Sequence, residues 1–473
     1  MIKKIWFTSA LCFLTGCAAG PDYQSPSLHI SDIWFSAETQ MTEQLTSQIT
    51  EQKVVHTKWW ENFNDQLLNK YIKQALANNK DINIALANLR SARASGREQA
   101  SSFWPSITAG GSAGRSKKIT STSTRTNSTS NTYNANFDAS WEIDIFGGNR
   151  RADQAADARI GVSQAEYHDV MLSTFSEVAR TYYEARSLQK RIVNTKKNIQ
   201  LLNKTLEIVQ DRLNIGETSK FDLSLAQSEY QLTRARIPNL HAELKASVYS
   251  LSVLLGLPPE ALLQEMERIQ PLPTPPDMVP VGLRSDILRR RPDIRMAERE
   301  LAAAIADLGS ETASLFPKFF LTGNIGSQAT LFGDLFSAGT GLWSLALATQ
   351  WTVFEGGAIN ARIEQREAES QAALLRYEKT VLEALRDAET ALMAYGQELA
   401  TRARLAQGVA SLKKAKILTR ALYSAGEQDY LTLIDTERQL VASEDNLIIS
   451  ETNSITKLIT LYTALGGGWE IEN

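Results

Sequence analysis

The stretch Asp81–Pro105 reads DINIALANLRSARASGREQASSFWP, and the stretch Asp293–Pro317 reads DIRMAERELAAAIADLGSETASLFP. Both begin with Asp-Ile, share alanines and a leucine at the same places, and end with proline. Shorter motifs recur at nearly the same offset: Gly147-Gly148 as Gly356-Gly357, Gly216-Glu217 as Gly426-Glu427, and Leu255-Gly256 as Leu465-Gly466. A repeat of about 210 residues is far longer than a solenoid module, so the sequence predicts two similar halves.

Two candidate strands follow each copy of this stretch. We expect them at residues 105–120 and 133–146 in the first half and at 317–329 and 341–354 in the second. Residues 121–132 are rich in Ser, Thr and Asn and predict an exposed loop between the first two strands. Residues 329–341 predict the corresponding loop of the second half.

One of these strands shows clear alternation. Tyr133, Phe137 and Trp141 fall on one face, and Asn134 and Asp138 fall on the other. Alternation of this kind is typical of a membrane barrel strand with lipid on one side and a wet lumen on the other. A buried sheet of a soluble protein has the same period, and on periodicity alone it is the better interpretation. Because four strands cannot close a barrel, membrane spanning would require association, and three chains would supply twelve strands.

Long helices are the second unusual feature. Residues 150–215 and 358–425 contain no proline and few glycines, and each would extend about 100 Å as one helix. Each stretch leads through a Gly-Glu turn to a returning helix, which predicts two long helical hairpins. The first returning helix has a heptad seam, and Pro238 inside it should kink or interrupt it. Residues 59–102 also have a helical pattern.

The N-terminus has the pattern of an export signal. Lys3 and Lys4 precede an apolar run of ten residues, which is too short to span a bilayer as a helix. The run ends in Leu14-Thr15-Gly16-Cys17, which resembles a bacterial lipobox in which Cys17 becomes the lipidated first residue. An ordinary signal peptide with a chance cysteine is the alternative. This order divides the chain into a signal peptide 1–16, a lipid-anchored extended segment 17–58, a first repeat 59–257, a proline-rich linker 258–280 and a second repeat 281–473.

Composition excludes several classes of function. Without Lys3 and Lys4 the chain has 48 basic and 53 acidic residues, a net charge of −5, which argues against nucleic-acid binding. The four histidines are scattered without metal-ligand spacing, and no phosphate-binding P-loop pattern occurs. Two S-x-x-K matches, at 187–190 and 411–414, fall within helices without companion motifs, and chance explains them best. We therefore expect no enzyme and no cofactor, so that any energy source must belong to a partner.

Several features together resemble one family. They are the lipobox, Gly20-Pro21-Asp22-Tyr23, the Trp59-Trp60 start, the two hairpin halves and the terminal run ALGGGW at 464–469. Taken in this order, they resemble the TolC-like outer-membrane factors, and within them the lipoproteins of RND-type multidrug efflux pumps. The resemblance covers essentially the whole mature chain, although no single motif is strong.

The resemblance implies both a fold and a function. The fold is mainly helical with membrane β-structure: a trimeric twelve-stranded β-barrel that continues into a twelve-helix periplasmic α-barrel. The function is that of an outer-membrane exit duct, with a periplasmic adaptor protein and an inner-membrane pump as partners. Two rival interpretations remain: a duct for protein secretion, and a lipid-anchored coiled-coil scaffold without a pore.

The same resemblance indicates where the duct is gated. Relatives are constricted near the tip of the second hairpin, and the family's gating residues match Tyr423, Asp435 and Arg438. A second arginine expected beside the tyrosine is Leu422 here. We expect Arg438 to pair with Asp435 one helical turn away, although an exposed pair of this kind contributes at most about 1 kcal/mol. The adaptor would contact the two hairpin tips, at Gly216, Glu217, Gly426 and Glu427.

Overall fold

The computed structural model describes residues 18–27, 31, 34–35, 48–50, 58–120, 126–274, 276, 278–282 and 284–469. The chain folds into two compact units that each combine segments from both sequence halves. We name residues 1–27, 88–164 and 296–378 the strand unit, and residues 28–87, 165–295 and 379–473 the hairpin unit. Four helices pass from one unit into the other: α4 (Lys80–Ala100), α5 (Gly148–Asn214), α9 (Pro292–Thr312) and α10 (Ala358–Ala425).

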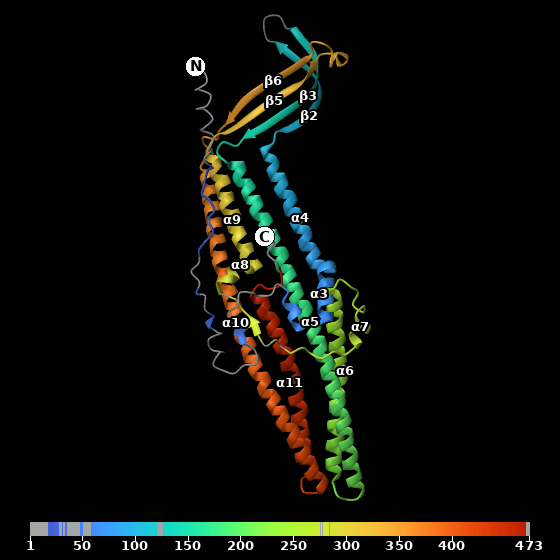
Figure 1. Ribbon diagram of the computed structural model, residues 1–473. Coiled ribbons are helices and arrows are strands. Elements are labelled where there is room, and N and C mark those ends of the chain that lie inside the picture. The colour runs from blue at the N-terminus through green and yellow to red at the C-terminus, as the bar shows by residue number, and fades with distance from the viewer. Residues whose placement is uncertain are drawn as a thin grey trace. The chain divides into compact units, whose positions relative to one another are not determined.

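The strand unit contains one antiparallel sheet of four strands in the order β2-β3-β5-β6 (Figure 1). The strands are β2 (Ser106–Thr120), β3 (Thr126–Ile143), β5 (Lys318–Ala329) and β6 (Gly341–Gln350), with the 3-10 turn η6 (Phe332–Asp334) before β6. Two further 3-10 turns, η3 (Ser101–Phe103) and η5 (Ala313–Leu315), end α4 and α9 just before β2 and β5. The proline that follows each turn, Pro105 or Pro317, forces the chain out of the helix.

The register of the sheet separates apolar from polar side chains. Phe137 pairs with Ile325, and Ile325 pairs with Trp343, so three strands contribute to one apolar row. The next residues along each strand form a polar row on the opposite face, where Asp138 pairs with Asn324 and accepts its amide hydrogen bond at 2.6 Å. The apolar row is open to solvent in the single chain, with Trp343 80% exposed. The expected alternation of the second strand is therefore confirmed.

Three strand boundaries differ from those expected by three residues or more, and one of them is the end of β3, at Ile143 rather than at 146. Residues 126–132 are not a loop, because they pair with residues 114–120 of β2 and extend β3. Their Ser, Thr and Asn side chains suggested a loop, but threonine also favours strands, and the partner strand satisfies the backbone. The last strand ends at Gln350 rather than at 354, because Gln350 already pairs with Lys318, the first residue after Pro317.

The hairpin unit is built from two long helical hairpins (Figure 1). Helix α5 has 67 residues and is followed by α6 (Lys220–Leu254), and α10 has 68 residues and is followed by α11 (Tyr430–Ala464). Ser219 and Asp222 form a reciprocal capping box at the start of α6, and the Asp429 side chain accepts from Thr432 N at the start of α11. Helix α6 continues through Pro238, so the expected interruption does not occur.

Shorter elements complete the hairpin unit. They are η2 (Trp59–Phe63), α3 (Gln66–Asn78), α7 (Leu263–Glu267), η4 (Arg284–Asp286), α8 (Ile287–Arg290) and a parallel pair formed by β1 (Gln48–Thr50) and β4 (Met278–Pro280). The helical pattern of residues 59–102 is thus divided between several elements. Trp59 is fully buried and stacks on Tyr462 of α11, with ring centroids 5.7 Å apart. None of the described helices is long and apolar enough to cross a membrane.

Two junctions join helices end to end in the hairpin unit. The Asn79 side chain, which precedes α4, donates to the carbonyl of Leu254 at the end of α6 at 2.8 Å. The Arg291 side chain, which precedes α9, donates to the carbonyl of Ala464 at the end of α11 at 3.2 Å. At each junction a glycine with positive φ lets the backbone turn closely. Gly256 lies against Asn78, and Gly466 lies against Arg290.

Candidate functional site

The two hairpin tips have the same local geometry. Gly216 and Gly426 adopt φ of +82° and +81°, the left-handed conformation that glycine allows at a helix C-terminus. The next residue closes the tip in each case, because Glu217 N donates to Arg212 O at 2.8 Å and Glu427 N donates to Leu422 O at 3.0 Å. Both tips also expose a large apolar side chain soon after the turn: Phe221 is 61% exposed and Leu431 is 52% exposed.

Tyr423 is buried near the second tip. Its side chain is only 3% exposed and packs in a cluster with Val209 of α5, Ala226 of α6 and Tyr430 of α11. The guanidinium of Arg212 lies over the Tyr423 ring, 4.6 Å from its centroid. Among the described residues, the Tyr423 hydroxyl has no hydrogen-bond partner. The ring of Tyr423 therefore connects the second hairpin to the first.

The arginine beside the Tyr423 ring is Arg212 of the first hairpin, whereas position 422, where an arginine was expected, is leucine. Counted from Gly216 and Gly426, Arg212 and Leu422 occupy aligned positions of the two halves. A cation over a tyrosine face is attractive, so Arg212 stabilises the buried ring. Sequence reasoning considered only the residues next to Tyr423 and missed Arg212, although the aligned Gly-Glu motifs could have indicated it.

Arg438 has a different partner from the one expected. Its Nε donates to Glu229 Oε2 of α6 at 2.6 Å, whereas Asp435 accepts from Gln439 Nε2 at 2.9 Å. The predicted pairing of Asp435 with Arg438 is therefore wrong within the chain. Glu229 is buried and Asp435 is exposed, so leaving the Glu229 carboxylate without a counter-charge would cost more free energy. Like the Arg212–Tyr423 contact, this ion pair connects the two hairpins.

A second carboxylate is buried beside this ion pair. Glu437 is only 2% exposed, and its Oε1 lies 3.4 Å from Nζ of Lys416 on α10. Burial, followed by the charges of Glu437 and the neighbouring Tyr423, raises the pKa of the Tyr430 hydroxyl. Sequence reasoning missed Glu437 and Lys416, because the spacing of residues along one helix does not show which charged side chain turns toward the other helices.

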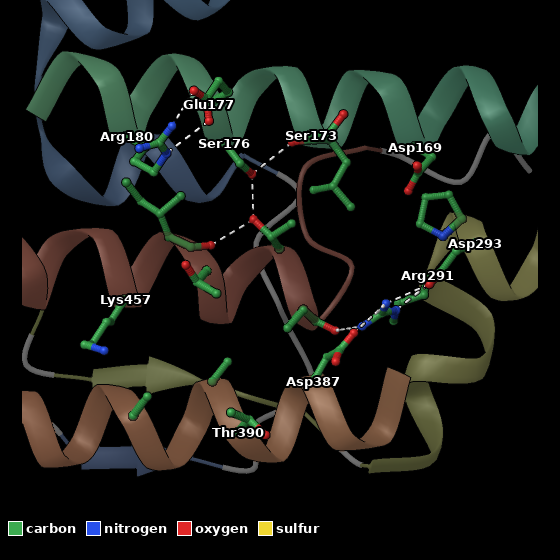
Figure 2. Close-up of a pocket in the computed structure, with 18 of the residues that line it drawn as sticks. Asp169, Ser173, Ser176, Glu177, Arg180, Arg291, Asp293, Asp387, Thr390 and Lys457 are labelled. Atoms are coloured by element: carbon green, nitrogen blue, oxygen red, sulfur yellow. Dashed lines mark hydrogen bonds and ion pairs between the residues drawn. The ribbon is translucent and has the colours of Figure 1, made fainter. Parts of the chain in front are cut away.

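The second junction borders a cavity of about 790 Å³ within the hairpin unit (Figure 2). Helices α5, α9, α10 and α11 line it, and its walls carry four acidic and four basic side chains: Asp169, Glu177, Asp293 and Asp387, and Arg180, Arg291, Arg386 and Lys457. Arg291 forms a bidentate ion pair with Asp293, at 3.0 and 2.7 Å. Burial and the charge of Asp293 raise the pKa of the Asp169 carboxyl, and Arg291 opposes this shift.

Cys17 lies outside the described residues, but the segment that follows it is held by the strand unit. Ala19 N donates to the carbonyl of Phe146, at the junction between β3 and α5. The buried guanidinium of Arg151 donates to the carbonyls of Ala19 and Gly20 at 3.2 and 3.3 Å and to Asp22 Oδ1 at 2.7 Å. This clamp places the residues just after Cys17 beside the end of β3.

Comparison with known proteins identifies the family. The model of the outer membrane efflux protein family matches residues 71–257 and 283–467. The chain is 30% identical to the probable efflux pump outer membrane protein TtgC of Pseudomonas putida, over 99% of this chain and 96% of that protein. It is 28% identical to the cation efflux system protein CusC of Escherichia coli O157:H7, over 99% of each. The solved outer-membrane channel OprN matches with a TM-score of 0.90 and 30% identity, over 96% of this chain and all of that one. The chain belongs to the outer membrane efflux protein family and is an outer-membrane component of an efflux system.

Proposed function

We propose that three copies of this chain form the exit duct of a tripartite efflux system. The observation that carries this proposal is the four-stranded sheet, whose outer strands β2 and β6 have one partner each among the described residues. An open edge of this kind is a template for further pairing. Pairing β2 of one copy with β6 of the next gives a closed ring of twelve strands, with the Phe137–Ile325–Trp343 row toward lipid and the Asp138–Asn324 row toward water.

The two halves are structural repeats of one design in this proposal. The paired helices support it, because α4 and α9 have 21 residues each and α6 and α11 have 35 each. Three copies then contribute twelve helices in addition to the twelve strands. The duct conducts passively, so a periplasmic adaptor and an inner-membrane pump supply energy and selectivity. The names of the relatives support this division of labour, because TtgC is named as a probable efflux pump outer membrane protein and CusC as a cation efflux system protein.

A toxicity panel tests this role in cells. Deletion of the gene should sensitise the cell to compounds that its pump exports, and the wild-type chain should restore resistance. The matched control is a deletion of the inner-membrane pump, which should sensitise the cell to the same compounds. If the deletion changes sensitivity to none of them, or blocks secretion of a protein instead, this proposal fails.

The gate is proposed at the tip of the second hairpin. The Arg212–Tyr423 contact and the Arg438–Glu229 ion pair hold that hairpin against the first. Asp435 is exposed beside them, and in the proposed trimer the Asp435 side chains of the three copies face one another around the axis. In this proposal each carboxylate accepts a hydrogen bond from a donor of the neighbouring copy, which offsets the repulsion between like charges and holds the three tips together. Asp435 therefore sets how tightly the three tips close in the resting duct.

Two substitutions test this gate. Asp435→Ala should raise basal conductance and admit bulky antibiotics without loss of the trimer, because it removes the acceptor at the tip. Leu422→Arg should tighten closure by supplying the arginine that the family resemblance led us to expect at this position. Glu364→Ala, an exposed carboxylate of α10 in the strand unit, is the control. Unchanged conductance in Asp435→Ala, or a more open Leu422→Arg pore, would reject the assignment.

The tips are also the proposed contact for the adaptor. Gly216-Glu217 and Gly426-Glu427 form the turns, and the exposed Phe221 and Leu431 add apolar area beside them. Replacing both Phe221 and Leu431 by Ser should weaken crosslinking to the adaptor and leave channel conductance in bilayers unchanged. Equal crosslinking in the variant and the wild type would remove these residues from the contact.

Cys17 is the proposed lipid anchor. The Arg151 clamp supports it, because it fixes the segment after Cys17 at the base of the sheet. Cys17→Ser should lose labelling by a radioactive or clickable fatty acid, whereas Cys12→Ser, inside the leader, should keep it. Labelling that survives in Cys17→Ser would contradict the anchor.

A further inference from the structure

Asn79 and Arg291 occupy aligned positions, each two residues before the Asp-Ile start of the repeated stretch. Each side chain donates to the last carbonyl of a returning helix, Leu254 O for Asn79 and Ala464 O for Arg291. Terminal carbonyls of a helix have no partner within the helix, so a donor from the next element stabilises both ends. Asn79 and Arg291 therefore join the end of a returning helix to the start of the next helix in the same way in the two halves.

The junctions differ in what else the side chain reaches. Asn79 Oδ1 accepts from Ile82 N at 3.0 Å, so the side chain connects only α4 and α6. Arg291 also donates to Ala384 O at 3.5 Å and lies 3.6 Å from Asp387 Oδ2, and both of these residues belong to α10. The longer, charged side chain of Arg291 thus also connects α10 to the junction between α9 and α11 (Figure 2).

Charged groups surround Arg291 at this contact. Asp293 of α9 and Asp387 of α10 both lie within 4.0 Å of Arg291, and Asp169 of α5 lines the same cavity. The Arg291 side chain is largely buried, whereas Asp387 is half-exposed and also pairs with Arg386 of its own helix at 2.7 Å. Removing the Arg291 guanidinium would deprive Asp169 and Asp293 of this cation, and it would remove the ionic contact between α10 and the start of α9.

We propose that Arg291 is an ionic latch that fixes α10 at the second junction, whereas Asn79 is a neutral link whose side chain makes no hydrogen bond to α5 among the described residues. This inference rests on the proposed gate, because α10 carries Tyr423 at its far end. Asp387 and Tyr423 are separated by about 54 Å of continuous helix at 1.5 Å per residue. A tilt of about 5° at the latch therefore moves the tip by about 5 Å, enough to separate the contacts that hold the gate closed.

The direct test replaces Arg291 by the residue of the first junction. Arg291→Asn should raise the open probability of single channels in planar bilayers roughly fivefold or more, with an unchanged trimer. Asp387→Asn should act in the same direction, and the double variant should not exceed the larger single effect, because the two residues share one interaction. Arg291→Lys should restore part of the closure. Arg289→Asn is the matched control, since Arg289 is exposed two residues earlier.

The possible outcomes distinguish a failure of the proposed latch from a failure of the proposed duct. Wild-type open probability in both Arg291→Asn and Asp387→Asn would overturn the latch. If Arg291→Asn fails to assemble, Asp387→Asn decides alone, because it leaves the bond to Ala464 in place. A wild-type protein without any channel would refute the duct, and the latch would then be judged by hydrogen exchange. Amides around Ala384 should exchange faster in Arg291→Asn than in Arg289→Asn, and equal rates would overturn it.

Discussion

At the scale of single residues, Tyr423 contributes its ring rather than its hydroxyl. The ring is buried under Arg212, and the hydroxyl has no partner among the described residues. Tyr423→Phe should therefore leave the single-channel open probability close to wild type, because it removes only an unpaired polar atom. Tyr423→Ala should open the channel and destabilise the tip by about 3–5 kcal/mol, the usual cost of deleting a buried aromatic ring. Equal opening in the two variants would show that the hydroxyl is the gating group.

Asp169 gives a prediction about pH. Burial and the charge of Asp293 raise its pKa above the unfolded value, so the folded protein favours the protonated carboxyl. Its stabilising contribution is complete below the unfolded pKa and is lost as pH rises through the folded pKa. Asp169→Asn should therefore melt at a higher temperature than wild type at pH 7, with the difference shrinking toward about pH 3.5. A lower melting temperature at pH 7 would mean that the charged form is the stabilising one.

The contacts of single residues in the proposed gate were only partly predictable from the sequence. Tyr423, Asp435 and Arg438 all lie on the second hairpin near its tip, where the resemblance placed them. The partner of Arg438 was predicted wrongly, because helical spacing brought Asp435 within reach but could not show the buried Glu229 on another helix. Arg212 was missed for the same reason, since its contact with Tyr423 joins two hairpins that are distant in sequence.

At the scale of elements, the glycines at the two junctions yield a prediction. A Cβ on Gly256 would lie 2.4 Å from Asn78 O, and one on Gly466 would lie 2.8 Å from Arg290 O. Both have positive φ, so alanine adds backbone strain and a clash, together about 2–4 kcal/mol. Gly216→Ala is the control, because it has positive φ but open space and should cost about 1 kcal/mol. The melting temperature of Gly216→Ala should therefore be well above those of Gly256→Ala and Gly466→Ala. Three equal melting temperatures would contradict the close backbone contacts at the two junctions.

The long periodic helices could be predicted closely from the sequence, whereas the breaks between elements could not. The long helices expected at 150–215 and 358–425 are α5 and α10 within two residues, since proline-free runs with helix formers leave few alternatives. The break at Asn79 was not predicted, because it depends on the carbonyl of Leu254, which lies far along the chain. The pairing of residues 126–132 was likewise decided by the partner strand.

At the scale of the whole molecule, the central claim is that this chain is one third of a duct. A sheet with two open edges and an apolar face exposed in the single chain is incomplete alone, and closure by three copies satisfies both features. The sequence predicted the four strands of this sheet and the alternation of the second one. The sequence could not show how the sheet closes, because closure depends on contacts between copies.

The most direct test is the single-channel conductance of the purified, full-length protein in planar bilayers, recorded separately for the trimer and monomer fractions. We predict that the trimer gives discrete, reproducible conductance steps of one size and that the monomer gives none, because four strands cannot enclose a pore. A trimer fraction that inserts without conducting, or a monomer fraction that conducts with the same steps, would contradict the account.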